Sequence, residues 1–188
     1  MEEEEVHRYN KVVDLAKEME GERSHIRAAE LWDQASRMVD RPILRHACQI
    51  DRGRCMSTGG EFDDAKKTLE DVVSQMKDNE EEFSEMLLEG YVYLAWNEHY
   101  RENSELSMSF FWKAIEVSER NSLNLDGSNI WPFFSFLGKE IERLNVIGDK
   151  TGMSLVFNDW IKAGKALGAN EQDLEPLMDK MKALGVEL

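Results

Sequence analysis

Apolar residues recur at helical spacing along almost the entire chain, and this periodicity restricts the fold more than any other feature. Val12, Leu15, Ala16 and Met19, for example, would lie along one side of a helix. Signals for β-hairpins are missing, because the Asp126-Gly127 pair lies between two helical patterns rather than between alternating apolar segments. The sequence therefore predicts an all-α protein.

Short polar or glycine-containing segments divide the periodic pattern into about nine helices. These segments are residues 21–24, 40–42, 59–60, 78–79, 103–104, 121–129, 148–152 and 168–170. Because the connections are short, we expect consecutive helices to be antiparallel. Ser24 is expected to cap the helix that follows it. Residues 148–152 lack the glycine spacing and the preceding strand of a phosphate-binding loop, so they are interpreted as a turn before a helix.

A pattern of small and bulky residues repeats along the chain. In the clearest unit, Ala28 comes thirteen positions after Leu15, and Ser107 has the same distance from Leu94. Small residues would let two helices of a hairpin approach, and bulky ones such as Leu15 and Trp32 would fill the space between hairpins. The residues that define the four units are Leu15, Ala16, Ala28, Trp32 and Ala35; Gly53, Met56, Ala65, Leu69 and Val72; Leu94, Ala95, Ser107, Phe111 and Ala114; and Phe134, Leu137, Gly138 and Ile141.

This pattern resembles the tetratricopeptide repeat, in which W-x2-L-G-x2-Y on one helix precedes A-x3-F-x2-A on the next. The resemblance implies a short solenoid of stacked, antiparallel helical hairpins in a single domain, 1–188. Its units are residues 9–40, 43–77, 83–120 and 129–168, followed by a capping helix at 171–185. The steps between equivalent positions are 37, 42 and 43 residues, longer than the usual 34. Another array or bundle of helical hairpins is the alternative.

The formal net charge of −15 argues against two classes of partner. Phosphate backbones and anionic membranes both attract clusters of lysine and arginine. No apolar run approaches the roughly 20 residues of a membrane-spanning helix, and the acidic start, Glu2 to Glu5, differs from a secretion signal. We therefore expect a cytoplasmic protein that binds neither nucleic acid directly nor a membrane. The sequence leaves its oligomeric state open.

The residues that catalysis or metal binding requires do not form a recognisable motif. Cys48 and Cys55 are seven positions apart, about 10 Å along a helix, which is too far for a disulfide. His46 and Cys48 would point in different directions, and no second pair completes a zinc site. Nucleophile and kinase motifs are also missing. We expect no cofactor, no bound metal and no enzymatic activity.

A partner site follows from the resemblance. In tetratricopeptide arrays the first helix of each hairpin lines a concave groove, and ten residues of this chain would occupy it. An aromatic cluster in the third unit is their most distinctive feature, since aromatic side chains often anchor interfaces. The alternative is that Tyr93 and Trp96 belong to the core. The ten residues are Lys17, Ile50, Arg54, Tyr93, Trp96, His99, Tyr100, Phe136, Lys139 and Arg143.

Two functions fit these observations. The first is a protein-interaction module or adaptor that binds a peptide or helix of another protein in the groove. The second is an acidic inhibitor that imitates a polyanion and blocks a nucleic-acid-binding protein, suggested by Glu2 to Glu5 and by Glu80 to Glu82.

Overall fold

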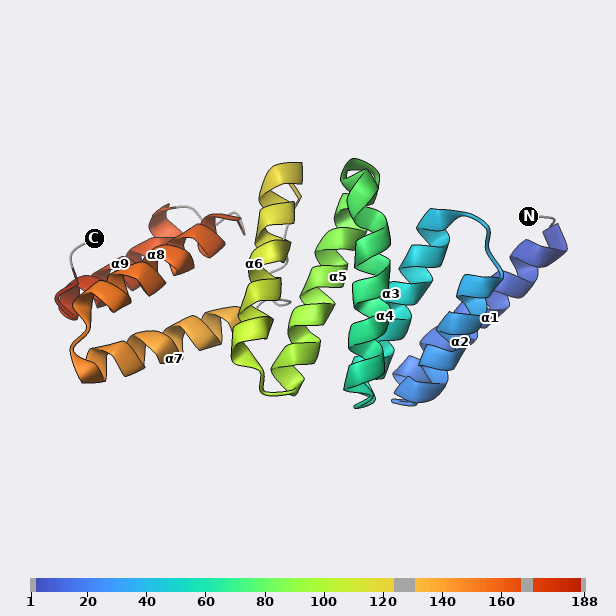
Figure 1. Cartoon of the computed structure of the whole chain (residues 1–188), viewed down its shortest axis with the longest axis horizontal. Coiled ribbons are helices and arrows are strands. Elements are labelled where there is room, and N and C mark those ends of the chain that lie inside the picture. The colour runs from blue at the N-terminus through green and yellow to red at the C-terminus, as the bar shows by residue number, and fades with distance from the viewer. Residues whose placement is uncertain (1–2, 124–130, 167–170, 187–188) are drawn as a thin grey trace. The chain divides into compact units, whose positions relative to one another are not determined.

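The computed structural model describes residues 3–123, 131–166 and 171–186, which form helices joined by short turns (Figure 1). No strand occurs in these ranges, and the all-α class is confirmed. The helices are α1 (Glu3–Gly21), α2 (His25–Arg37), α3 (Pro42–Thr58), α4 (Phe62–Met76), the 3-10 turn η1 (Lys77–Asn79), α5 (Glu80–Tyr100), α6 (Ser104–Asn121), α7 (Trp131–Ile147), α8 (Lys150–Ala166) and α9 (Glu171–Ala183).

The helix ends lie at the predicted breaks, except that residues 124–129 and 168–170 of two breaks lie outside the described ranges. Asp149 caps α8, because its Oδ1 accepts a hydrogen bond from the backbone N–H of Gly152 at 2.9 Å. Gly148 has a φ of 74° after the last turn of α7, a conformation that glycine adopts without strain. Residues 148–152 are therefore a turn and a helix start. Ser24 precedes α2, but its side chain makes no capping hydrogen bond, so that expectation is wrong.

Contacts between Cα atoms divide the chain into two compact units, residues 1–114 and 115–188, with the boundary inside α6. In the first unit α1 packs on α2, α2 on α3, α3 on α4 and α4 on α5. Helix α3 also packs on α5, so three helices cover it. The single domain expected from the sequence stays a prediction.

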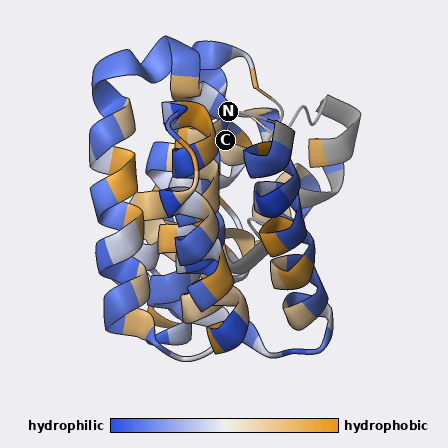
Figure 2. Cartoon of the chain, turned by 90° about the vertical axis from the view of Figure 1, so that its right-hand side faces the viewer, coloured by the Kyte–Doolittle hydropathy of each residue, from blue (hydrophilic) through white to orange (hydrophobic). Residues whose placement is uncertain are grey.

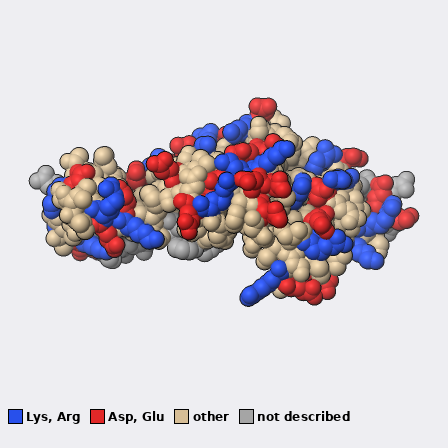
Figure 3. All heavy atoms as spheres, turned by 60° about the horizontal axis from the view of Figure 1, so that its bottom comes forward, with Lys and Arg blue, Asp and Glu red and all other residues tan. Residues whose placement is uncertain are grey.

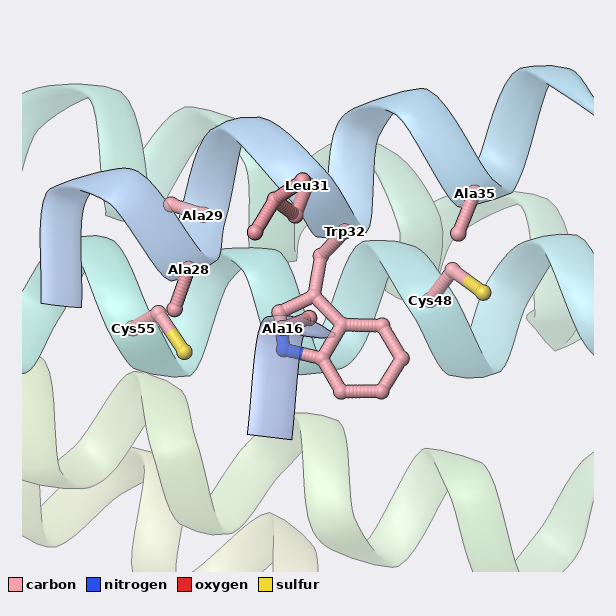
Figure 4. Close-up of a cluster of buried hydrophobic side chains, with 8 residues drawn as sticks. All are labelled: Ala16, Ala28, Ala29, Leu31, Trp32, Ala35, Cys48 and Cys55. Carbon is pink, nitrogen blue, oxygen red and sulfur yellow. The ribbon is translucent and has the colours of Figure 1, made fainter. Parts of the chain in front are cut away.

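The core of the first unit combines alanines with one large ring. Trp32 projects from α2 toward α3 and lies between the side chains of Cys55 and Cys48 (Figure 4). Ala16, Ala28 and Ala35 have no exposed surface, as expected for positions where helices approach closely. Leu15 is 40% exposed. Its expected role in filling the space between hairpins is wrong, because the adjacent Ala16, rotated by about 100° on the helix, faces the core instead.

The second unit has its own core, in which α7 packs on α8 and α8 on α9. A Cβ added at Gly138 would lie 3.5 Å from the Trp160 ring, so the ring packs directly on the α7 backbone. A small pocket of about 230 Å³ lies beside this contact, with Ile141, Met181 and Leu184 among its walls. The buried residues of this core are Ile141, Leu144, Met153, Phe157, Met181 and Val186.

Polar residues cover much of the outer surface. The outward sides of the helices nearest the viewer in Figure 2 are largely hydrophilic. Within the described ranges, none of the helices combines the length and the apolar composition needed to cross a bilayer.

Candidate protein-interaction surface

Five side chains of α5 form a continuous row, which we call the α5 stripe: Glu85, Glu89, Tyr93, Trp96 and Tyr100. Their spacing of four, four, three and four positions places them on one side of the helix. Glu85, Glu89 and Tyr100 are exposed, and Tyr93 and Trp96 are half-buried. The stripe is therefore acidic toward the start of α5 and aromatic toward its end.

The aromatic end of the α5 stripe is a cluster of rings in contact. The Trp96 ring lies 5.5 Å from that of Tyr100 and 5.7 Å from that of His99, measured between centroids. Phe62, the first residue of α4, lies 6.4 Å from Tyr100. His99 is exposed and 48% of Tyr100 is exposed. Exposed aromatic rings that lie together in this way are typical of sites where another molecule binds.

Polar contacts between α4 and α5 fix the position of these rings. The Asn97 amide donates a hydrogen bond to the Phe62 carbonyl at 3.1 Å. Glu98 is 1% exposed, and its carboxylate lies 3.0 Å from the Lys66 ammonium. Arg101 forms a 3.0 Å ion pair with Asp63 at the first turn of α4. The cluster is thus held in place before any partner arrives, which lowers the entropic cost of binding.

Ion pairs connect α1 and α3 next to the α5 stripe. The Arg54 Nη2 atom lies 2.8 Å from Glu20 Oε2 of α1 and 2.8 Å from Asp51 Oδ1 of α3. The Trp32 indole N–H also donates to Glu20, at 2.7 Å. The Arg54 guanidinium lies 5.9 Å from the centre of the Tyr93 ring, within range of a cation–π contact. One guanidinium is therefore shared by two carboxylates and an aromatic ring.

The pKa values of these groups show how the charges are distributed. Burial alone would raise the pKa of Glu20, but hydrogen bonds from Trp32 and Arg54 lower it below the usual range. Burial raises the pKa of Asp51, although Arg54 opposes the shift. Glu89 is exposed over much of its surface, yet desolvation near α3 and the negative charges of Asp51 and Glu85 raise the pKa of its carboxyl. Negative charge is in excess here.

The structure brings five of the ten predicted site residues into this region, namely Arg54, Tyr93, Trp96, His99 and Tyr100. Lys17 is an exposed residue of α1 that lies close enough to Asp51 to oppose the rise in its pKa that burial causes. Ile50 is a correction, since it is 2% exposed and belongs to the core. Asp51 and Arg54 lie on the half-buried side of α3, and Ile50, one position before Asp51, is rotated by about 100° toward the helices that cover α3.

The other three predicted residues, Phe136, Lys139 and Arg143, lie on α7 in the second unit. Phe136 is half-buried, and Lys139 is exposed. Arg143 is exposed and forms a 2.5 Å ion pair with Glu140 of the same helix. Arg54 and Arg143 are thus each paired with carboxylates of their own unit.

Four carboxylates of this surface were not predicted from the sequence: Glu20, Asp51, Glu85 and Glu89. The signal was present as spacing. Asp51 lies three positions before Arg54, and Glu89 and Glu85 continue the row of Tyr93 by about one and two helical turns, respectively. The pairing of Glu20 with Arg54 joins residues 34 positions apart, and no local pattern contains it.

Both cysteines are buried free thiols. Among the described residues, no group of three or more His, Cys, Asp or Glu side chains is arranged to hold a metal ion.

No protein-family model, curated protein or solved structure matches the chain.

Proposed function

We propose that the chain is a protein-interaction module, and that it holds a peptide or helix of a partner protein against α5 and the adjoining sides of α1 and α3. The aromatic cluster of Trp96, His99 and Tyr100 carries this proposal. Aromatic side chains dominate the binding energy of many interfaces, and this cluster is partly exposed and held by polar contacts around it.

We further propose that the helices are stacked as tetratricopeptide-like hairpins. Contacts between consecutive helices from α1 to α5, together with the contact of α3 with α5, support this arrangement. In such a stack the first helices of neighbouring hairpins lie side by side and present one continuous surface. Two contacts would lie along that surface: the ion pair between α1 and α3, and the contact of Arg54 on α3 with Tyr93 on α5.

Site-specific photo-crosslinking in extracts of the native cell tests the location of the site. A photoreactive residue in place of Tyr100 is expected to capture a partner protein, whereas the same residue at the exposed Lys67 of α4 serves as the control. Capture at both positions, or only at position 67, would contradict the proposal.

Trp96→Ala tests the energetic role of the cluster. An anchor residue contributes at least about 2 kcal/mol of binding free energy, so we expect the affinity for the captured partner to fall by at least 30-fold. Because Trp96 is half-buried, the variant also loses stability, and circular dichroism must show that it remains folded at the assay temperature. Tyr100→Ala removes a more exposed ring of the same cluster and should weaken binding with a smaller loss of stability. Unchanged affinity in both variants would contradict the proposed anchor.

The alternative, imitation of a polyanion, predicts binding that does not depend on Trp96. On the face drawn in Figure 3, basic side chains lie among the acidic ones. Partner binding that is insensitive to Trp96→Ala but falls steeply with ionic strength would favour this alternative.

A further inference from the structure

We infer that the segment held on the α5 stripe is basic, with a lysine or arginine beside Glu89 and Asp51 and an apolar anchor against Trp96 and Tyr100. This inference rests on the proposed function and specifies the chemistry of the partner.

Beside Tyr93, acidic side chains outnumber basic ones. The carboxylates of Glu20 and Asp51 share the Arg54 guanidinium. Glu85 and Glu89 form no ion pair with the described part of the chain, and they extend the same row. Lys17 is the other cation near Asp51. The raised pKa values of Asp51 and Glu89 agree with a surface that has more negative charge than its own cations neutralise. A positively charged side chain of the partner would neutralise this excess negative charge.

The surface beside Tyr93 also suits the methylene part of a lysine or arginine side chain. Tyr93 is half-buried, and its ring already accepts one guanidinium, that of Arg54, at 5.9 Å. Long basic side chains pack their methylene groups on apolar surface while the charged end stays among polar groups. A stripe with carboxylates on one side of Tyr93 and Trp96 on the other provides both environments. An acidic segment would meet repulsion from Glu85 and Glu89.

The distance between Glu89 and Trp96 along α5 determines how far apart the basic residue and the apolar anchor of the partner must be. Glu89 and Trp96 are seven positions apart on α5, which corresponds to about 10 Å along the helix axis. A partner helix lying along the α5 stripe would match this distance with a basic residue about seven positions from its apolar anchor. An extended segment would match it with about three positions.

A selection from a phage-displayed library of random peptides tests the inference. Peptides of about 16 residues cover about 24 Å as a helix, enough for both ends of the stripe. The full chain is immobilised, and peptides that bind the wild type but not Trp96→Ala are collected and sequenced. We expect these peptides to be enriched in lysine and arginine at about seven or about three positions from an aromatic or aliphatic residue.

Charge reversal at Glu89 provides the second measurement. Glu89→Lys should weaken the selected basic peptides by about tenfold or more, because it places like charges opposite each other, and the loss should shrink as salt is added. Glu70→Lys is the matched control, since it makes the same change in net charge at an exposed residue of α4 outside the stripe. It should leave binding unchanged.

The outcomes separate the inference from the proposed function. If peptides depend on Trp96 but carry no excess of basic residues, or if they bind Glu89→Lys and Glu70→Lys equally, the basic partner is wrong and the interaction site stands. If no Trp96-dependent peptide is enriched, both are wrong.

Discussion

Glu89 combines an exposed position with a raised pKa, and this has a consequence for stability. Because its pKa is higher in the folded chain than in the unfolded one, the ionised carboxylate destabilises the fold. At pH 7 we expect Glu89→Gln to unfold at a higher temperature than the wild type. The gain in the free energy of unfolding should be less than about 1 kcal/mol, because solvent screens the charge. The difference in the free energy of unfolding between Glu89→Gln and the wild type should vanish as the pH falls through the pKa of Glu89 in the folded chain and then below the ordinary pKa range of glutamate. A gain that persists at pH 3 would contradict this explanation.

Cys55 illustrates how burial controls reactivity. Burial raises the pKa of its thiol to about 12, and the carboxylate of Glu20 adds to the shift. Burial also raises the pKa of Cys48. Since the thiolate is the reactive form, we expect iodoacetamide at pH 8 to modify neither residue of the folded protein at an appreciable rate. Both should react quickly in guanidinium chloride, as mass spectrometry can show. Rapid modification of the folded protein would contradict the burial of these thiols.

At this scale the sequence predicted some contacts and not others. The aromatic cluster on α5 was found because three of its members lie within five positions of one another. The ion pair between Arg54 and Glu20 was not predicted, because the two residues are 34 positions apart in sequence. Ile50 was misplaced since a shift of one residue on a helix turns a side chain by about 100°, enough to exchange core for surface.

At the scale of helices, α3 and α4 lie close together at Gly53. A Cβ added there would lie 2.5 Å from Leu69 Cγ, which has no exposed surface and little room to move. Gly53→Ala should therefore destabilise the first unit by about 1 to 3 kcal/mol through overpacking, despite the higher helix propensity of alanine.

Gly21→Ala is the matched control for this prediction. Gly21 ends α1, and an added Cβ would meet nothing within 4 Å. The change should be neutral or stabilising by up to about 1 kcal/mol. Urea denaturation of both variants gives the two values. If Gly53→Ala matched Gly21→Ala, the close contact of α3 with α4 would be wrong.

The positions of the helices followed from local signals, and their partners did not. Periodicity and short polar breaks located the ends of α2, α3 and α4, because glycine, proline and polar residues interrupt helices at the level of single turns. The covering of α3 by three neighbours depends on contacts between segments far apart in sequence. The repeat pattern also predicted Leu15 as a packing residue, although 40% of it is exposed and the adjacent Ala16 faces the core.

For the whole chain, the division into two compact units makes a prediction about cooperativity. Phe157 is 3% exposed in the core of the second unit, so Phe157→Ala should cost about 3 to 5 kcal/mol. We expect hydrogen exchange of the amides in α7 and α8 to accelerate while exchange in α2, α3 and α4 is unchanged. Faster exchange in both units would show instead that the chain unfolds as the single domain expected from its sequence.

Glu20 links the proposed binding surface to the interior of the first unit. Its carboxylate holds Arg54 on the surface and accepts a hydrogen bond from the buried Trp32 indole. A cation that binds Asp51 and changes the position of Arg54 would alter the electric field at that indole. The chemical shift of the Trp32 indole N–H depends on this field, so its NMR resonance is an internal reporter that leaves Trp96 in place. That resonance would shift on binding of a ligand that never touches the ring.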